Sequence, residues 1–597
     1  RLEIWTDVNG MLSADPRLVK DTITIPTMSY EEAMELSYFG AKVIYPPTIQ
    51  PALSRQIPIG ILNSFDPIHP GTTISKSPEQ GPYFVKGLTC IQDIALVTLS
   101  GSGIIGVPGV AQRLFQALGV ENINILFITQ SSSEHTICFA INRHDDIVAR
   151  KAMEKAYEFE INLRKIDPIH IEYDLALVAV VGDGMRERAG IAGKLFSLLG
   201  ENGINIRAIA QGSTERNISF VINQHNATKA LNVLHEGFFL SKYKTVHLFL
   251  LGTGNVGATL IRQITVGQKT FKKAGSLDLK VCGIGNSKLT HFDPQGIELE
   301  NWETMLKVQG KALSLDEIKN QIKDFNLRNS ILIDVTASEE VSKIYVDLLS
   351  SNVHVVTANK IAASSSYENY KQLKETSAKH NVKFLNETNV GAGLPIIKTI
   401  RDLVLTGDHI HRIQAVLSGS LNYIFDRIGS DSCLFSVAVT EAREKGYTEP
   451  NPALDLSGKD VMRKMLILSR ETGLHLEMED IRNKSFLPEG TLDADGWEDL
   501  LRNLKKIDEK FDRERKELAT SNKRWRYMAS LDDGKVTTGL EEIDSTHPAY
   551  HLKGTDNIIL VWTDRYVNRP MVIAGAGAGP EVTASGVLAD VISISNV

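Results

Sequence analysis

The feature that most constrains the fold of this chain is an internal duplication. Two segments beginning at Ala95 and Ala176 align without a gap, at an offset of 81 residues. Each copy holds a β-branched apolar run, a glycine-rich turn, an amphipathic stretch and two further β-branched runs. This order predicts a small α+β module of the type βαββα, present twice. The first helix of each copy is expected to end at Gly119 or Gly200, since glycine favours a left-handed cap.

Composition and charge limit the classes of function. A chain of 597 residues, 42% hydrophobic and 23% charged, is long enough for three or four domains. A net charge of −7 gives no electrostatic reason to expect nucleic acid or an anionic membrane as partner. No apolar run is long enough to span a bilayer. Four scattered cysteines without CxxC spacing argue against disulfides and zinc, and fit a reducing cytosol.

The rest of the chain divides by its patterns. In residues 246–390 short β-branched runs alternate with helical stretches, as in a doubly wound parallel sheet. A charged stretch at residues 489–523 is expected to form a solvated helix pair. The first residues, RLEIWTDVNG, begin in an expected strand without Met or a signal peptide, so we expect residues to be missing before Arg1. The expected regions are 1–75, 76–160, 161–245, 246–390 and 391–570, with a helix in 571–597 that packs back on 246–390.

A dinucleotide fingerprint follows the first strand of the alternating region. The G-x-G-x-x-G pattern lies between an apolar strand and a helix, the context in which the motif binds a pyrophosphate at a helix N-terminus. The alternative is a tight structural turn. The six residues are Gly252, Thr253, Gly254, Asn255, Val256 and Gly257.

The ends of the next strands point to the cofactor type and to the nicotinamide side. The second strand lacks an acidic residue for a ribose 2′-hydroxyl, and Ser287 and Lys288 stand nearby. A cation there suits a 2′-phosphate, so NADP(H) is expected, with NAD(H) as an alternative. Thr336, Ser338 and Lys360 follow later strands, at the edge where ligands bind in open α/β sheets. Lys288 as a solvated turn residue, or Lys360 as a surface lysine, would be the ordinary alternative.

Taken together, the motifs resemble those of the bifunctional aspartokinase/homoserine dehydrogenases. The resemblance covers residues 1–597, with the kinase part represented only by its C-terminal end. It implies an α/β fold: an amino-acid kinase fragment, tandem α+β ACT domains, a doubly wound Rossmann domain and an α+β catalytic and oligomerisation domain. The motifs are TDVNG, ADPR, FGAKV, QSSSE, QGSTE, LLGTGNVG, VVTANK, ETNVGAGLP, LSGSLNYIFD, GYTEPNPALDLSGKDVMRK and GAGAGPEVTASGV.

The longest of these motifs gathers acids and a base. Asp460 and Lys464 are four residues apart on an expected helix that starts near Ser457, so they share a face. An exposed ion pair is the ordinary alternative. Reduction of an aldehyde needs a proton donor, and a lysine tuned by burial and charged neighbours can serve. The resemblance implies that Lys464 donates the proton and that Lys360 lies between nicotinamide and substrate.

The same motif offers carboxylates for the ammonium group of an amino-acid substrate. The resemblance implies that Glu449 and Asp455 bind it. Leu454 stands where the family often has an acid.

Two glycine-rich loops complete the dehydrogenase part. The resemblance implies a structural sodium ion bound by Glu387 and by the carbonyls of Val390, Ala392 and Leu394; the alternative is a turn with no ion. In the C-terminal loop, Gly577 is expected to approach the cofactor closely.

Polar residues at matching positions of the two repeats suggest an effector site. Gln130 and Gln211 stand at equivalent strand ends, beside Asn124 and Asn205. Such residues are usually turn formers, but their repetition favours a ligand, and the resemblance implies threonine as feedback inhibitor.

In the first segment four residues resemble nucleotide-contacting positions of amino-acid kinases. They are Thr6, Asp7, Asp15 and Arg17. Aspartate phosphorylation is expected only from a full-length chain, because the opening kinase motif has no counterpart in this sequence.

The expected function is therefore a homoserine dehydrogenase that interconverts L-aspartate 4-semialdehyde and L-homoserine and is inhibited by threonine. The competing hypothesis is a non-catalytic amino-acid-sensing scaffold. We expect a homodimer or homotetramer in the cytoplasm, or in the plastid for a plant protein, with neither nucleic acid nor membrane as partner.

Overall fold

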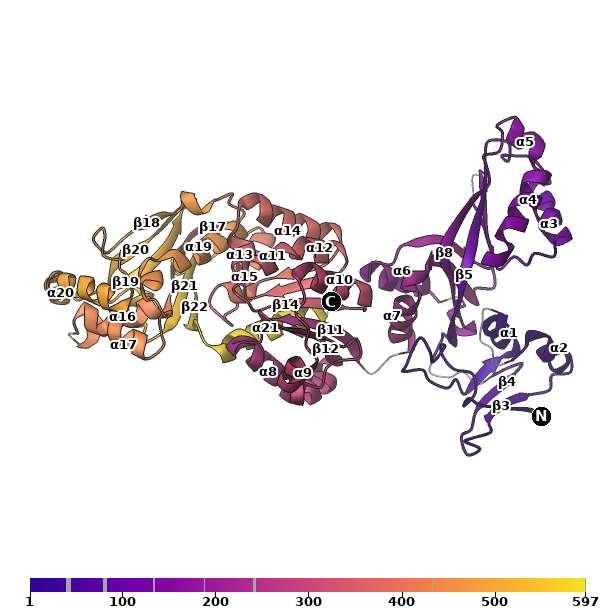
Figure 1. The fold of residues 1–597 in the computed structure, drawn as a ribbon, viewed down its shortest axis with the longest axis horizontal. Coiled ribbons are helices and arrows are strands. Elements are labelled where there is room, and N and C mark those ends of the chain that lie inside the picture. Colours follow the sequence, from indigo (N-terminus) through magenta and orange to yellow (C-terminus); the bar gives the residue numbers. More distant parts are fainter. Residues whose placement is uncertain are drawn as a thin grey trace. The chain divides into compact units, whose positions relative to one another are not determined.

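The computed structural model describes residues 1–38, 44–78, 83–131, 135–186, 188–239, 243–431 and 433–595. The motif FGAKV and the last three residues of QSSSE lie outside these ranges. The chain forms two compact units, Arg1–Lys244 and Thr245–Val597 (Figure 1).

The first unit begins with a small mixed sheet in the order β1-β3-β4-β2. Its core consists of buried isoleucines, Ile59, Ile61 and Ile74, together with Tyr30. The elements are β1 (Leu2–Thr6), β2 (Thr27–Ser29), α1 (Tyr30–Tyr38), α2 (Pro46–Ser54), β3 (Ile59–Asn63) and β4 (Thr72–Ser75).

The two repeats each have the predicted order βαββα and join into one antiparallel sheet of order β6-β7-β5-β8-β10-β9. The first copy contains β5 (Gly87–Ser100), α3 (Val110–Val120), β6 (Phe127–Gln130), β7 (Thr136–Asn142), η1 (Arg143–Asp145), α4 (Asp146–Ala156) and α5 (Glu158–Asn162). The second contains β8 (His170–Val181), η2 (Asp183–Met185), α6 (Ile191–Glu201), β9 (Ile206–Gln211), β10 (Asn217–Asn223), η3 (Gln224–Asn226) and α7 (Ala227–Phe239). Although β6 and β9 are the outer strands of this order, they lie in contact with each other.

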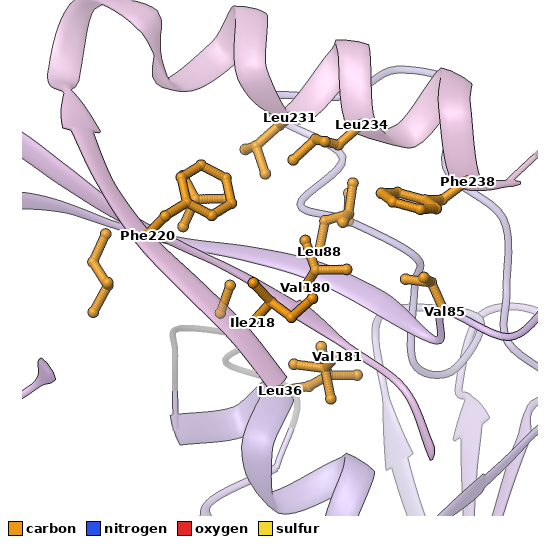
Figure 2. Close-up of a cluster of buried hydrophobic side chains, with 14 of the residues drawn as sticks. Leu36, Val85, Leu88, Val180, Val181, Ile218, Phe220, Leu231, Leu234 and Phe238 are labelled. Atoms are coloured by element: carbon orange, nitrogen blue, oxygen red, sulfur yellow. The ribbon is translucent and has the colours of Figure 1, made fainter. Parts of the chain in front are cut away.

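The core of the second repeat also anchors the first segment. Figure 2 shows Leu231, Leu234 and Phe238 of α7 above the sheet residue Val180, and Leu36 of α1 belongs to the same buried cluster. A hydrophobic core shared in this way ties the N-terminal sheet to the second repeat.

The expected helix ends were wrong in detail. Helices α3 and α6 continue one residue past Gly119 and Gly200, and neither glycine has a left-handed backbone. The chain reverses slightly later, at Asn122 (φ 55°) and Gly203 (φ 69°). The reason is that each helix completes its last turn through the glycine before the left-handed residue is needed.

The second unit begins with a six-stranded sheet of order β13-β12-β11-β14-β15-β16, whose order reverses between β11 and β14. The pairs β11–β14, β14–β15 and β15–β16 are parallel, and β13 is antiparallel to β12. The strands are β11 (Lys244–Leu251), β12 (Leu277–Gly285), β13 (Thr290–Phe292), β14 (Ser330–Asp334), β15 (His354–Thr357) and β16 (Phe384–Leu385). The helices are α8 (Asn255–Gly275), η4 (Leu299–Asn301), α9 (Trp302–Gln309), α10 (Leu315–Phe325), α11 (Glu339–Lys343), α12 (Tyr345–Ser350), α13 (Ile361–Ser364) and α14 (Tyr367–Lys379).

A second sheet of the same unit has the order β18-β20-β19-β17-β21-β22. Its strands are β17 (Ile410–Val416), β18 (Arg482–Lys484), β19 (Lys523–Asp532), β20 (Lys535–Asp544), β21 (Asp556–Thr563) and β22 (Met571–Ala576). The accompanying helices are η5 (Glu387–Asn389), α15 (Ile397–Leu405), α16 (Gly419–Asp431), α17 (Phe435–Glu444), α18 (Ala453–Leu456), α19 (Lys459–Glu471), η6 (Met478–Asp480), α20 (Trp497–Thr520) and η7 (Pro548–His551).

The charged stretch forms one helix rather than the expected solvated pair. Helix α20 buries Leu500, Leu504 and Phe511 in the core of the second sheet. Most of its charged residues are exposed, which is why composition alone suggested full exposure, but Asp508 is buried and accepts hydrogen bonds from Ser436.

The helix α21 (Pro580–Ser595) lies along α8 (Figure 1). Its residues Ala584, Val587 and Val591 are buried in the core that contains Leu260 and Ile264 of α8. No helix in the described part of the chain combines the length and apolar character needed to cross a membrane.

Candidate active site

The glycine fingerprint forms the turn between β11 and α8. Gly252 has φ +102°, which other residues rarely adopt. A Cβ on Gly257 would lie 1.8 Å from the carbonyl oxygen of Gly252, so helix and strand could not pack so closely. A Cβ on Gly254, the N-cap of α8, would meet nothing within 4 Å. The helix N-terminus is thus open at the point where a pyrophosphate would bind.

A buried carboxylate connects the loops after β14 and β15. Asp334 accepts hydrogen bonds from the Tyr345 hydroxyl (2.5 Å), the Thr336 backbone N–H (2.7 Å) and the Asn359 side-chain amide (3.1 Å). Burial raises the pKa of Asp334, although its hydrogen bonds oppose the rise. The Tyr345 hydroxyl also lies 3.0 Å from Thr357 Oγ1. The network fixes the loop that precedes Lys360.

Three of the expected catalytic residues meet at one point. Lys464 Nζ lies 2.8 Å from Asp460 Oδ2, and Lys360 Nζ lies 3.4 Å from Asp460 Oδ1. Lys464 also donates a 2.6 Å hydrogen bond to the carbonyl of Leu417. The Lys464 side chain is only 11% exposed, whereas the Asp460 side chain is 49% exposed. The pair is therefore not an ordinary surface ion pair, because its cation is buried.

The pKa shifts follow from this geometry. Burial lowers the pKa of Lys464, and the neighbouring Asp460 carboxylate opposes that decrease. Burial acts to raise the pKa of Asp460, but the charges of Lys464 and Lys360 outweigh it, and the pKa is lowered. The arrangement keeps Asp460 ionised and makes Lys464 a better acid than a free lysine.

Asp455 lies next to this centre. It accepts hydrogen bonds from the Ser420 hydroxyl (2.8 Å) and the Glu449 backbone N–H (2.9 Å), and burial raises its pKa. The Glu449 side chain is exposed. Sequence reasoning did not single out Ser420 or Leu417, although both lie in the motif LSGSLNYIFD; a serine-rich turn at a strand end was the available signal.

The C-terminal glycine loop lies against a buried amide. A Cβ on Gly577 would lie 2.0 Å from Asn557 Cγ, so only glycine fits there. Asn557 is fully buried, and neither polar atom of its side chain has a hydrogen-bond partner among the described residues. Beyond this loop, Glu581 of α21 pairs with Arg262 of α8.

The loop after β16 offers an all-oxygen donor set. Glu387 accepts hydrogen bonds from the backbone N–H groups of Ile397 (2.7 Å) and Lys398 (2.8 Å), which leaves lone pairs on its carboxylate. Ala392 has a left-handed backbone, φ 55°. Asp590 accepts a hydrogen bond from the Glu387 backbone N–H (3.1 Å), and burial raises the pKa of Asp590 to about 7. This chemistry fits a hard cation.

The turn after β12 is exposed at Ser287 and Lys288. The Asn286 side chain accepts hydrogen bonds from the backbone N–H groups of Lys288 and Leu289, both 2.8 Å. The asparagine thereby fixes the turn, and the lysine side chain remains exposed.

In the repeats, Gln211 lines a pocket of about 190 Å³ together with Arg188, Gly190 and Glu215. Gln130, Asn124 and Asn205 are exposed. The two glutamines end β6 and β9, the outer strands that lie in contact.

The kinase-like positions are engaged with each other. Arg17 forms an ion pair with Asp15 at 2.6 Å, and Thr6 donates a hydrogen bond to Asp7 at 3.0 Å. The structure brings none of the four into a pocket described for the first unit.

The reversed strand order, the glycine turn and the lysine centre define a Rossmann-fold oxidoreductase. Four family models match: amino acid kinase (1–63), ACT domain (97–157 and 178–238), homoserine dehydrogenase NAD binding domain (252–387) and homoserine dehydrogenase (395–592). The chain belongs to the bifunctional aspartokinase/homoserine dehydrogenase family. It carries a homoserine dehydrogenase with regulatory ACT domains, which confirms the predicted fold class.

Individual relatives cover almost the whole chain. The Haemophilus influenzae bifunctional aspartokinase/homoserine dehydrogenase is 39% identical over 590 residues, 99% of this chain and 72% of that protein. The chloroplastic enzyme 2 of Arabidopsis thaliana is 37% identical over 604 residues, 100% of this chain and 66% of that protein. The crystal structure of a Candida auris protein of unknown function matches with a TM-score of 0.55 and 34% identity, covering 59% of this chain and 98% of that one.

Proposed function

We propose that this chain interconverts L-aspartate 4-semialdehyde and L-homoserine with NADPH, and that Lys464 is its acid–base group. The observation that carries the proposal is the buried Lys464 Nζ, held between Asp460 and the Leu417 carbonyl and close to Lys360. The bound dinucleotide supplies the two reducing electrons. Lys464 Nζ gives its proton to the aldehyde oxygen during reduction and takes it back during oxidation.

The neighbouring residues hold the substrate for this transfer. The Asp460 carboxylate favours the charged form of Lys464, and Lys360 adds positive charge beside the reacting oxygen. Asp455, with its carboxylate oriented by Ser420, and Glu449 receive the substrate ammonium group. Thr336 and Ser338 line the cofactor side, in the loop that Asp334 holds.

We assign NADP(H) as the preferred dinucleotide, with NAD(H) as the alternative. The support is the exposed Ser287–Lys288 turn, which carries a cation and no acid after β12. Gly252, Thr253, Gly254, Asn255, Val256 and Gly257 hold the pyrophosphate, and Gly577 closes over the cofactor.

A sodium ion is the proposed occupant of the Glu387 loop. Glu387 and the carbonyls of Val390, Ala392 and Leu394 would hold it. Its proposed role is structural, because α21 packs closely against this loop. A Cβ on Gly586 of that helix would lie 3.2 Å from the Ala392 carbonyl oxygen.

Threonine is the proposed effector of the ACT pair. The pocket beside Gln211 supports this, because it is small and offers both an amide and charged groups to an amino acid. Gln130, Asn124 and Asn205 are assigned to the same role by their equivalent places in the repeats. We propose a homodimer or homotetramer located in the cytoplasm, or in the plastid in a plant; all four cysteines are free, and the Arabidopsis relative is named chloroplastic.

The deciding experiment follows NADPH absorbance after addition of aspartate semialdehyde, with and without millimolar threonine. Turnover that threonine suppresses would support both proposals. Turnover indifferent to threonine would contradict the effector assignment alone. Absence of turnover with intact NADPH binding would favour the sensing scaffold.

A further inference from the structure

We propose that His409 and His411 form a chelating site for a transition-metal ion at the mouth of a cavity in the second unit. The cavity measures about 610 Å³ and lies away from the residues assigned to catalysis. It is lined by both histidines, by Asp408 and Asp533, and by apolar side chains such as Leu474. The proposal is independent of the proposed dehydrogenase activity.

The spacing of the two rings suits a shared metal. His409 precedes β17 and His411 lies within it, and their ring centroids are 4.7 Å apart. Their Nδ1 atoms are 3.2 Å apart. Two metal–nitrogen bonds of about 2.0 Å at a tetrahedral angle place the nitrogens roughly 3.3 Å apart. The distance between the two nitrogens is thus close to the one that a shared ion requires.

The second nitrogen of His411 is already oriented. His411 Nε2 lies 2.6 Å from Asp564 Oδ1. With Nε2–H donating to this carboxylate, His411 Nδ1 accepts the hydrogen bond from His409 Nδ1–H. A metal ion bound by both Nδ1 atoms would replace that proton, and His409 would carry its proton on Nε2. Metal-bound histidines commonly have such a carboxylate partner, which fixes the ring and raises its basicity.

Backbone hydrogen bonds from two neighbouring segments fix the main chain of both histidines. The Asp564 backbone N–H donates to the His409 carbonyl (3.1 Å), and the Asp533 backbone N–H donates to the His411 carbonyl (3.3 Å). The start of β17, the end of β21 and the turn between β19 and β20 thus meet at the site. Ligands on such fixed elements lose little entropy when they bind.

The charges nearby favour a cation. Asp533 and Asp564 stand beside the rings, and Asp408 is buried with one carboxylate oxygen that has no hydrogen-bond partner among the described residues. The guanidinium of Arg565, 3.9 Å from Asp408, offsets part of this charge. Imidazole donors select zinc, copper or nickel over magnesium or calcium.

The site supplies two protein ligands, and water or a small molecule in the cavity would complete the coordination. Within the described ranges, no cluster of three His, Cys, Asp or Glu side chains is placed to hold a metal. Reversible binding is therefore expected, weaker than that of a closed structural zinc site with four protein ligands.

The test is a calorimetric titration of the full chain with zinc chloride, in a sodium-containing buffer at neutral pH. We expect saturation near one zinc per chain. His409→Ala and His411→Ala should each weaken binding at least tenfold, and Asp564→Asn should weaken it about tenfold. His144→Ala is the matched control, since that histidine is 78% exposed and belongs to the first unit; its affinity should equal that of the wild type.

Cobalt(II) absorption gives a second readout, because nitrogen ligation changes the visible spectrum and both histidine variants should abolish that change. Absence of saturable zinc binding would overturn the proposal. So would unchanged affinity in both histidine variants, or an equal loss in His144→Ala.

Discussion

Lys464 and Asp460 stand one turn apart on α19, with Nζ and Oδ2 at 2.8 Å, yet one side chain is buried and the other is half exposed. The carboxylate is in contact with solvent, whereas the ammonium group is enclosed by protein. The ionised Asp460 therefore acts on the buried Lys464 through its charge, and the first two predictions below test that effect.

Replacing the buried lysine should remove proton transfer without removing the cofactor. For Lys464→Ala we expect kcat to fall at least about 100-fold, with NADPH affinity unchanged within twofold. Steady-state kinetics and fluorescence titration with NADPH would check both values. Lys459→Ala, on the same helix and exposed, is the control and should retain activity. Full turnover by the Lys464 variant would disprove its assigned role.

The pH profile should report the coupling of the pair. Asp460 raises the pKa of Lys464 against the effect of burial, so Asp460→Asn should lower that pKa further. Reduction needs protonated Lys464, so its alkaline limb should move to lower pH by about one unit. Rates of aldehyde reduction across neutral to alkaline pH test this. The control variant Asp493→Asn changes an exposed carboxylate and should leave the alkaline limb in place. A shift of the limb toward higher pH in Asp460→Asn would contradict the proposed effect of Asp460 on Lys464.

We expect that weakening the hydrogen-bond network around Asp334 will reduce both the stability of the protein and its affinity for the cofactor. Tyr345→Phe removes a buried hydroxyl that donates to Asp334, which should cost about 1–3 kcal/mol of unfolding free energy. It should also raise the KM for NADPH more than it changes kcat, because the Asp334 carboxylate that holds Thr336 and Asn359 loses one of its own hydrogen bonds. Denaturant unfolding and kinetics measure the two effects. An exposed tyrosine, Tyr566→Phe, is the control, and an unchanged KM in Tyr345→Phe would refute the positioning role.

The contact between Gly577 and Asn557 predicts a specific rescue. Gly577→Ala should reduce NADPH affinity at least tenfold, because its Cβ would overlap the Asn557 amide. Shortening that amide in the double variant Gly577→Ala/Asn557→Ala should restore part of the affinity. Gly429→Ala is the control, since a Cβ there meets nothing within 4 Å. If the double variant binds no better than Gly577→Ala, steric overlap is not the cause.

The sequence predicted those features that depend on residues close together in the chain. The fingerprint predicted the turn at Gly252, and the four-residue spacing of Asp460 and Lys464 predicted their contact. Contacts between residues far apart in the chain could not be predicted in this way. The acceptor of Lys464 is the Leu417 carbonyl, 47 positions away, and a backbone oxygen has no signature in the sequence. The side-chain amide next to Gly577 belongs to Asn557 on β21, and it is the pairing of β21 with β22 that brings the two residues together.

Helix α21 also has a consequence for biosynthesis. The core of the dinucleotide sheet includes Val587 and Val591, which are made more than 300 residues after the glycine turn of α8. During translation, α8 and α9 can cover only part of that face of the sheet until residues 580–595 leave the ribosome. The core of this sheet is therefore completed last, and we expect a ribosome stalled within residues 391–570 to leave part of its apolar surface accessible to chaperones.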